Sequence, residues 1–230
     1  MKILPPGSEK ELMDRAYSLA GKTLHDLSVE WNQTLPDSLI HAKGWIGQLL
    51  EKALGATASN LDQPDFLDLG IELKTLPVNT NGQPVESTFV CSVAIPSPKE
   101  NWLESRVYRK LARVLWVPIE VLSDRSLAMR RIGMPVLWSP SHLIAEKLQQ
   151  DWEELMEMIE LGHFENLDAY KGEYLQIRPK AANSKTLIKV ISHLGEPLSI
   201  VPKGFYLRSQ FTKSIINDHY LLAGNGIGLK

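Results

Sequence analysis

Apolar side chains recur along this chain with two different periods, and their order predicts a mixed α/β fold. Apolar residues three to four positions apart are typical of helices that bury one face. Shorter apolar runs bounded by turn residues are typical of strands. The helical segments are 9–20, 24–31, 41–54, 106–113, 141–161 and about 209–220. The strand-like segments are 69–75, 86–95, 114–119, 134–138, 172–178 and 202–208. We therefore expect a central sheet flanked by helices.

Two local signals refine these boundaries. Ser8 and Glu11 form a capping-box pattern, in which a hydroxyl and a carboxylate satisfy backbone N–H groups at the start of the first helix. The segment Asn79–Gly82 is a turn signal between two strand-like runs. It predicts that 69–75 and 86–95 form a hairpin or lie as neighbouring strands of one sheet.

Composition limits the class of protein. The chain has 230 residues, a formal net charge of -2, 43% hydrophobic residues and one cysteine. This length suits one substantial domain or two lobes sharing a core. Cys91, as the single cysteine, excludes an internal disulfide, and its apolar surroundings indicate a buried, inert thiol. The near-neutral charge argues against a general polycationic nucleic-acid binder but permits a local basic cleft.

The N-terminal sequence and the Gly-rich end of the chain each lead to one expectation. The N-terminal sequence lacks the apolar core of a signal peptide, and no apolar run is long enough to span a membrane. We therefore expect a soluble, cytoplasmic protein. The Gly-rich end of the chain, residues 221–230, is expected to be a disordered tail.

The stretch 65–75 carries the strongest chemical signal. Side chains alternate along a strand, so Glu72 and Lys74 project from the same face, and Asp65 just before the strand can curl back toward them. Carboxylate oxygens suit Mg²⁺, which keeps several waters. A nearby ammonium can orient a water or offset the charge on a phosphate. This arrangement is typical of metal-dependent nucleases.

Spacing alone leaves another explanation open: a strand with a solvated, salt-bridged face is the commoner origin of such a pattern. The apolar residues between the charges, and a further acid at Glu51 on the preceding helix, favour the nuclease site. Lys43-Gly44 lies at the expected entrance of that helix, where N–H groups and the helix dipole favour a phosphate. The ordinary alternatives are a solvated loop lysine at Lys43 and a surface charge at Glu51.

Charged clusters elsewhere suggest which surfaces meet nucleic acid. Segment 106–113 holds four basic residues beside a core strand, which suits a DNA backbone, although a solvated helix face is the ordinary alternative. Arg178-Pro179-Lys180 places two cations across a proline, and Arg is well suited to read guanine. We expect a solvated face directed away from DNA at the acids of the long helix, namely Asp151, Glu153, Glu154, Glu157 and Glu160.

Blocks of sequence, in the same order over nearly the whole chain, resemble the bacterial MutH mismatch-repair endonucleases. These blocks are Lys43–Gly47, Asp65, Gly70–Thr75, Thr88–Cys91, Arg113–Trp116, Trp138–Pro140, Asp151–Met156, Gly172–Asn183 and Gly204–Leu207. The chain departs from the family pattern around 96–101 and 190–200 and in the Gly-rich tail, and no active-site position is altered.

The resemblance implies a fold like that of type II restriction endonucleases, with a mixed central sheet flanked by helices and two lobes forming a DNA-binding cleft. It also implies a Mg²⁺-dependent monomer that nicks the unmethylated strand at hemimethylated GATC sites, activated by MutL with MutS upstream. We expect a single endonuclease domain over 1–230, with a catalytic lobe at about 1–105 and a recognition lobe at about 106–220.

The resemblance also assigns roles residue by residue. It implies metal-binding and catalytic acids at Asp65 and Glu72, a catalytic lysine at Lys74 and a supporting acid at Glu51. It implies DNA contacts at Lys43, Gly44, Lys110, Arg178, Pro179, Lys180 and Tyr206. Residues 178–180 would read bases, and Tyr206 would lie near the methylation-sensitive adenine. From position alone, Tyr206 is instead a half-buried core aromatic.

Two rival functions share parts of this pattern. An autonomous GATC-specific restriction endonuclease would use the same fold and triad but would cut both strands without MutL. A non-catalytic GATC-binding protein would have no need to place Asp65, Glu72 and Lys74 together, so the intact triad argues against it.

Overall fold

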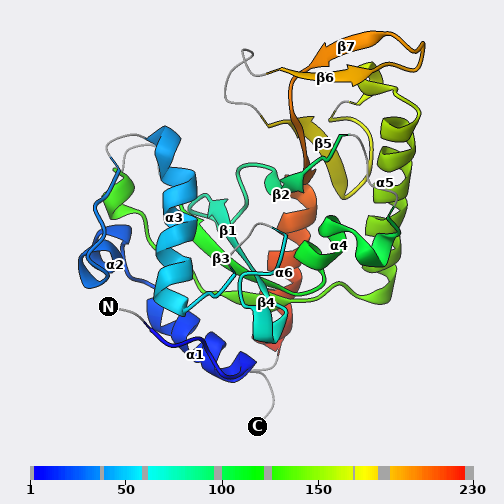
Figure 1. The fold of residues 1–230 in the computed structure, drawn as a ribbon. Coiled ribbons are helices and arrows are strands. Elements are labelled where there is room, and N and C mark those ends of the chain that lie inside the picture. Colours follow the sequence, from blue (N-terminus) through cyan, green and yellow to red (C-terminus); the bar gives the residue numbers. More distant parts are fainter. Residues whose placement is uncertain are drawn as a thin grey trace. The chain divides into compact units, whose positions relative to one another are not determined.

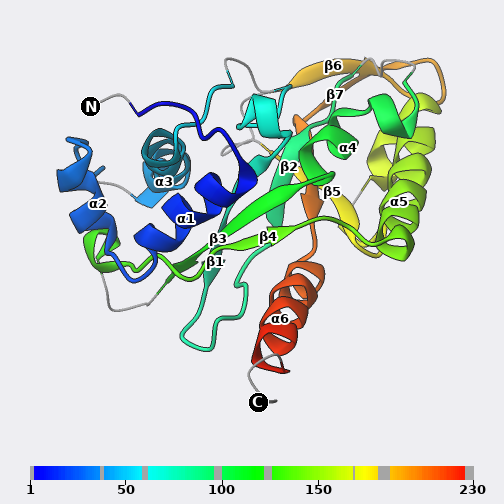
Figure 2. The same ribbon diagram turned by 90° about the horizontal axis from the view of Figure 1, so that it is seen from below.

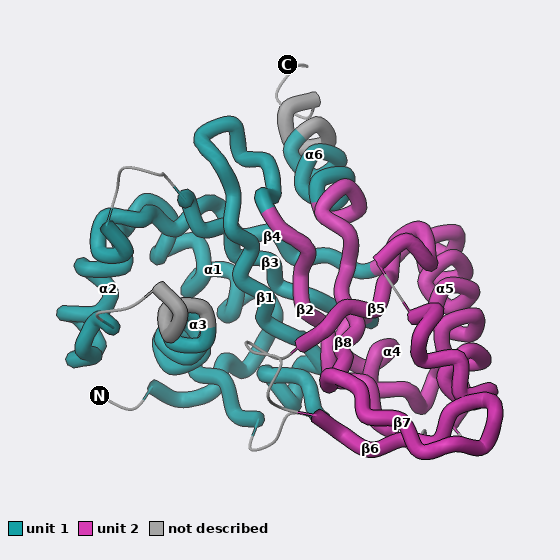
Figure 3. The backbone as a smooth tube through the Cα atoms, turned by 90° about the horizontal axis from the view of Figure 1, so that it is seen from above, with its two compact units in different colours: residues 1–85, 112–139, 213–230 teal, residues 86–111, 140–212 magenta. Residues whose placement is uncertain are grey.

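The computed structural model describes residues 3–36, 39–58, 62–95, 100–121, 126–167, 169–180 and 187–225, with the backbone alone for 39–43 and 221–225. They form two compact units built from separate stretches of the chain (Figure 3). The first comprises 1–85, 112–139 and 213–230, and the second comprises 86–111 and 140–212. The expected boundary between two lobes near residue 105 therefore does not match the units, whose stretches alternate along the sequence. The reason is that the strand at 114–120 pairs with the strand at 72–78.

Three helices and a three-stranded sheet form most of the first unit. The helices are α1 (Glu9–Leu19), α2 (Leu24–Glu30) and α3 (Leu39–Leu54). The sheet has the order β1 (Glu72–Val78), β3 (Val114–Glu120) and β4 (Val136–Trp138). Strands β1 and β3 run parallel, and β4 is antiparallel to β3. Figures 1 and 2 show α1, α2 and α3 on one side of these strands.

Alternation along β1 decides which of its faces the helices cover. Leu73 belongs to one core cluster with Leu115 of β3, Leu12 of α1 and Leu50 of α3. Successive strand residues point to opposite faces, so Glu72 and Lys74 lie on the face of β1 that these helices do not cover. The helical cluster thereby fixes the strand that carries the charged residues.

Capping at the helix starts follows the local sequence with one shift. The Ser8 hydroxyl accepts from Glu11 N at 3.2 Å, as predicted, but the Glu11 carboxylate accepts from Gly7 N at 2.8 Å and not from Ser8 N. A complete capping box occurs at α2 instead, where Thr23 Oγ1 accepts from Asp26 N and Asp26 accepts from Thr23 N. Both arrangements satisfy N–H groups that helix starts leave without a partner.

The second unit contains an antiparallel sheet, a separate hairpin and two helices. The sheet has the order β2 (Thr88–Ser92), β8 (Lys203–Leu207) and β5 (Leu175–Pro179). Strands β6 (Ile188–Ile191) and β7 (Pro197–Ile200) form the hairpin. The helices are α4 (Arg106–Leu111) and α5 (His142–Glu160).

Helix α6 (Ser209–Asn225) follows β8. The 3-10 turns are η1 (Leu67–Leu69), η2 (Trp102–Glu104), η3 (Leu127–Met129) and η4 (Phe164–Asn166).

The predicted pairing of 69–75 with 86–95 is wrong. The turn itself is present, since Asn79 Oδ1 accepts from the backbone N of Asn81 at 2.9 Å and of Gln83 at 3.0 Å. However, β1 pairs with β3, and β2 pairs with β8 in the other unit. A turn signal shows only that the chain reverses, whereas the choice of partner strand depends on distant residues.

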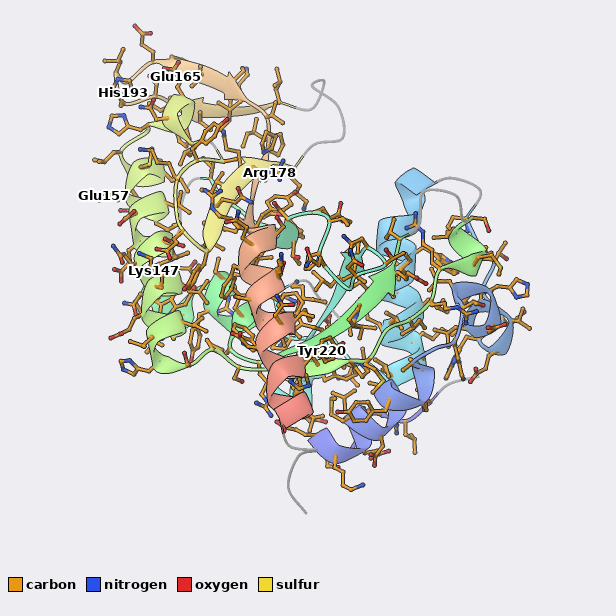
Figure 4. All side chains as sticks on the ribbon, turned by 180° about the vertical axis from the view of Figure 1, so that it is seen from behind. Lys147, Glu157, Glu165, Arg178, His193 and Tyr220 are labelled. Carbon is orange, nitrogen blue, oxygen red and sulfur yellow. The ribbon has the colours of Figure 1, made fainter. Side chains whose placement is uncertain are left out.

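Two further expectations need correction. Asp151 is not on a solvated face: it is 3% exposed, while Glu153, Glu154, Glu157 and Glu160 are exposed as expected. Figure 4 shows Glu157 pointing away from α5. The expected tail at 221–230 begins as helix, because α6 continues to Asn225, and 226–230 lie outside the described residues. No helix in the described part of the chain is long and apolar enough to cross a membrane.

Candidate active site

A tight turn returns Asp65 to the start of β1. Phe66 N donates to Ile71 O at 2.9 Å, and Ile71 N donates to Phe66 O at 3.3 Å. Between them lie η1 and Gly70, which adopts the left-handed conformation with φ 64°, a conformation that glycine reaches without strain. Because this antiparallel bridge pairs Phe66 with Ile71, the next residues outward are Asp65 and Glu72. The spacing between the two acids is therefore the length of one closed turn.

The Asp65 carboxylate is fastened to the backbone of β1. Glu72 N donates to Arg113 O at 3.0 Å and so points toward β3. Leu73 N points to the opposite edge, because successive backbone N–H groups alternate across a strand, and there it donates to Asp65 Oδ2 at 2.8 Å. One carboxylate oxygen is thus used for positioning. Strand β1 is terminal in its sheet, so this edge is available to the aspartate.

Glu72 and Lys74 form a buried ion pair, which confirms that they share one face of β1. Lys74 Nζ lies 2.8 Å from Glu72 Oε1, and their side chains are 11% and 5% exposed. Removing two charges from water is costly, and close pairing offsets much of that cost. The ammonium and the carboxylate consequently hold each other in place, and both make further interactions within the protein.

Apolar side chains surround this ion pair on the sheet. The parallel register sets Val114 beside Glu72 and Trp116 beside Lys74, so all four side chains project from one face. Trp116 is fully buried, and its ring meets Trp138 with centroids 6.4 Å apart. A charge at the edge of such an apolar surface interacts more strongly with another charge than it would in water.

The donor set fits Mg²⁺ and does not fit a structural zinc site. No group of three or more His, Cys, Asp or Glu side chains that could hold a metal occurs among the described residues. Asp65 and Glu72 thus offer two hard oxygen donors. Structural zinc sites take four protein ligands, commonly Cys and His. Magnesium is commonly held by one or two carboxylates and keeps several waters, so a two-carboxylate site suits it.

Helix α3 carries Glu51 close to this turn along the chain. Glu51 is half-buried, and its backbone O accepts from Gly55 N at 2.9 Å. Shortly after the helix, Thr57 N donates to Asp65 O at 2.9 Å, which ties the helix end to the turn. Within the described residues, Glu51 forms no three-carboxylate metal group with Asp65 and Glu72.

The expected position of Lys43 and Gly44 at a helix entrance is wrong. Helix α3 begins at Leu39, so both residues lie inside the helix, where backbone N–H groups bond to the preceding turn. The backbone N–H groups of Lys43 and Gly44 are therefore not among those that a helix start leaves without a partner. Gly44 is exposed, and a side chain at this position would meet nothing within 4 Å. The Lys43 side chain lies outside the described residues.

Arg178 and Tyr206, two of the predicted recognition residues, share one face of the β2–β8–β5 sheet in the second unit, whereas Pro179 alternates to the other face. Phe89, Tyr206 and Gln176 form one cross-strand row, and Gly204 pairs with Arg178 in the next row but one. Tyr206 is half-buried and meets Phe89 edge-on, with ring centroids 5.3 Å apart. Burial raises the pKa of the Tyr206 hydroxyl, so this phenol stays protonated near neutral pH.

Arg178, Pro179 and Lys180 are exposed at the end of β5. Arg178 Nη1 donates to Ser87 Oγ at 2.9 Å, and Lys180 Nζ donates to Ser92 Oγ at 2.6 Å. The Lys180 ammonium also lies 5.0 Å from the centre of the Phe89 ring. Figure 4 labels Arg178 on this strand. Both cations therefore have defined directions in the protein alone.

Lys110 does not have the exposed position expected of a phosphate contact. It lies in α4 and is 5% exposed. A buried ammonium is held by interactions within the protein, and Lys110 makes such interactions.

Local sequence patterns did not single out the residues in and just before β2 that orient the two cations, namely Ser87, Phe89 and Ser92. They also did not single out Gln176, which is 3% exposed and whose Nε2 donates to Ser87 Oγ at 2.9 Å. Ser87 and Gln176 are 89 positions apart, so no local pattern connects them. The strand-like run 86–95 and the Thr88–Cys91 block pointed to this strand, but neither pointed to its contacts with Arg178 and Lys180.

Comparison with known proteins gives a consistent result. A family model described as "DNA mismatch repair enzyme MutH" matches residues 54–151. The chain is 48% identical over 217 residues to a "DNA mismatch repair protein MutH" of Vibrio parahaemolyticus, covering 94% of this chain and 96% of that protein. It is 47% identical over 221 residues to the protein of the same description from Escherichia coli, covering 96% of each. With such identity over nearly its full length, the chain belongs to the MutH family of DNA mismatch repair proteins.

Proposed function

We propose that this chain is a Mg²⁺-dependent DNA endonuclease of mismatch repair that nicks the unmethylated strand at hemimethylated GATC sites. The observation that carries the proposal is the pair of contacts at the start of β1: Asp65 accepts from Leu73 N, and the neighbouring Glu72 and Lys74 form a buried ion pair. A solvated, salt-bridged strand face, the rival explanation of the sequence pattern, is a poor description of side chains that are 5% and 11% exposed.

Each residue has a distinct part in hydrolysis of one phosphodiester bond. Asp65 and Glu72 would hold the ion, each with one oxygen engaged in positioning. When bound, Mg²⁺ supplies polarisation of the phosphate and a lowered pKa for water. The Lys74 ammonium orients the attacking water or stabilises the negative charge that develops on the phosphate. The supporting role of Glu51 comes from the family resemblance, and the end of its helix is tied to the Asp65 turn by Thr57 N.

Recognition is assigned to the second unit. Arg178, Pro179 and Lys180 read bases of the GATC site, and Tyr206 packs against the edge of the adenine whose methylation blocks cutting. Lys43 and Gly44 contact the DNA backbone. Lys110 has the same assignment by family resemblance, but its burial gives this role no support.

A single active site in a monomer accounts for cutting one strand. In this proposal the endonuclease fold has two lobes that form a DNA-binding cleft. The enzyme acts in the cytoplasm, and MutL activates it once MutS has found a mismatch. A restriction endonuclease with the same triad would need a second active site to cut both strands without MutL.

A nicking assay tests the proposal. Supercoiled plasmids with unmethylated, hemimethylated and fully methylated GATC sites are incubated with the protein and Mg²⁺, with and without MutL. We expect nicked circles from the first two substrates, faster nicking with MutL, and little product from the third. Linear product without MutL would indicate the restriction endonuclease, and binding without cleavage in Mg²⁺ would indicate a non-catalytic GATC-binding protein.

A further inference from the structure

The Ser87 hydroxyl receives two hydrogen bonds from β5. Gln176 Nε2 and Arg178 Nη1 each donate to Ser87 Oγ at 2.9 Å. A serine oxygen has two acceptor lone pairs, so both are occupied by these two donors. Ser87 immediately precedes β2, and Arg178 and Gln176 project from the same face of β5. One atom therefore connects an exposed cation to a buried amide.

The two donors differ in how firmly they are held. Gln176 is 3% exposed and lies in a row between paired strands, opposite Tyr206. Arg178 is exposed, and a free arginine side chain has many rotamers to lose when it meets a ligand. Because Gln176 is fixed, it fixes the Ser87 oxygen, and the Ser87 oxygen then fixes the direction of the Arg178 guanidinium. Such preorganisation lowers the ordering cost of binding.

We propose that Ser87 is a positioning residue that sets the base specificity of Arg178. The inference rests on the proposed function, in which Arg178 reads the GATC site. Loss of the Ser87 hydroxyl leaves the guanidinium and its charge in place but frees its orientation. The charge alone attracts every DNA sequence equally, whereas bidentate reading of one base requires a defined orientation.

Lys180 provides a contrast on the same sheet. It is held by Ser92 Oγ at 2.6 Å and by the Phe89 ring at 5.0 Å, so it has two supports from β2. Gly204 lets that ring lie close to β8, because a side chain there would meet Phe89 Cε2 at 2.8 Å. Arg178, by contrast, donates to the Ser87 hydroxyl. Removing Ser87 Oγ therefore perturbs the orientation of Arg178 more directly than removing Ser92 Oγ would perturb that of Lys180.

The test compares discrimination between GATC and single-substituted duplexes, measured as a ratio of dissociation constants by competition binding without Mg²⁺. The variants are Ser87→Ala, Ser87→Thr, Arg178→Ala and the Ser87→Ala/Arg178→Ala double variant. Ser199→Ala, at an exposed serine of β7, is the matched control. Ser87→Cys, with a poor acceptor in place of the hydroxyl, is the second lesion should Ser87→Ala fail to fold.

We expect Ser87→Ala to lower the discrimination ratio about threefold to tenfold, the net effect of one hydrogen bond of ordinary strength. Binding to non-cognate DNA and its salt dependence should not change. Ser87→Thr keeps the hydroxyl and should restore the ratio, Ser199→Ala should match the wild type, and the double variant should match Arg178→Ala.

Three results would overturn the inference. If Arg178→Ala loses discrimination while Ser87→Ala keeps it, Ser87 does not position the arginine, and the assignment of Arg178 as a reader stands. If Ser87→Ala lowers the ratio equally in the Arg178→Ala background, Ser87 acts independently of Arg178. If Arg178→Ala itself keeps the wild-type ratio, the reader assignment in the proposed function fails as well.

Discussion

The two candidate sites of this protein are constructed in opposite ways. In the first unit, Asp65, Glu72 and Lys74 come from a single stretch of chain, folded back by one turn and bonded to its own backbone. In the second unit, Arg178 lies in β5 and Lys180 directly follows that strand, but the hydroxyls that orient them belong to residues near either end of β2. The first site is a local structure within a sheet, and the second exists only once distant strands have paired.

This difference agrees with the role proposed for each site. Holding a metal ion requires carboxylate oxygens at fixed positions, which a short turn and one strand can supply. Reading several base pairs requires a broad surface with several oriented donors, and a sheet of three strands supplies one. A local site should therefore be sensitive to single charges within it, whereas a surface assembled from several strands should be sensitive to residues that hold those strands in place.

The largest effect is expected from breaking the ion pair of the first site. Glu72→Gln leaves the Lys74 ammonium buried without its carboxylate and should lower the free energy of unfolding by roughly 3–5 kcal/mol. Lys74→Met should lower the free energy of unfolding by a similar amount, because the Glu72 carboxylate then remains buried without the ammonium that pairs with it. The double variant should recover most of the loss, because neither charge remains. Urea unfolding of the four proteins measures the coupling, and simple additivity of the two single losses would contradict a tight pair.

Next in size is the effect of Asp65 on catalysis. Asp65→Ala removes a proposed metal ligand and should lower the nicking rate in Mg²⁺ at least about a hundredfold, while DNA binding persists. Asp68→Ala, at an exposed aspartate of the same turn, is the matched control and should keep the wild-type rate. Near wild-type nicking by Asp65→Ala would remove this residue from the metal site.

Asp151 tests how far the second unit depends on distant contacts. Its carboxylate accepts from the backbone N of Glu173, Tyr174 and Leu175 at 2.6–2.9 Å, just before and at the start of β5. Asp151→Asn places an amide donor among these N–H groups and should lower the free energy of unfolding by about 2–3 kcal/mol. Glu154→Gln, on the exposed side of α5, should change stability by less than about 0.5 kcal/mol. Equal stability of the two variants would show that Asp151 does not anchor β5.

The smallest effect concerns methylation. An N6-methyl group on adenine projects into the major groove, where a packed side chain leaves it no room. Tyr206→Ala should narrow the ratio of nicking rates between hemimethylated and fully methylated GATC by about fivefold, corresponding to roughly one kcal/mol of discrimination. Tyr206→Phe keeps the ring and should preserve the ratio. An unchanged ratio in a folded Tyr206→Ala variant would exclude Tyr206 as the sensor, whereas marked thermal destabilisation would identify it as a core aromatic.

Local sequence was sufficient to place Glu72 and Lys74 together and to predict most elements. Strand alternation predicted that Glu72 and Lys74 share a face, and the 2.8 Å ion pair confirms it. Helical periodicity predicted α1, α2 and α5. The predicted start of the long helix at residue 141 agrees with the N-cap of α5, which is Ser141. These features depend on residues a few positions apart, whose geometry the backbone fixes directly.

The tertiary structure decided everything that requires a partner from far along the chain. Periodicity cannot predict that β1 pairs with β3 and that β2 pairs with β8. It also cannot predict that the Asp151 carboxylate, unlike the other acids of α5, is buried and accepts hydrogen bonds from three backbone N–H groups. It also cannot connect Ser87 to Arg178, which lies 91 positions away. Such contacts form because buried polar groups must find hydrogen-bond partners wherever the folded chain provides them, and the sequence shows those groups without showing their neighbours.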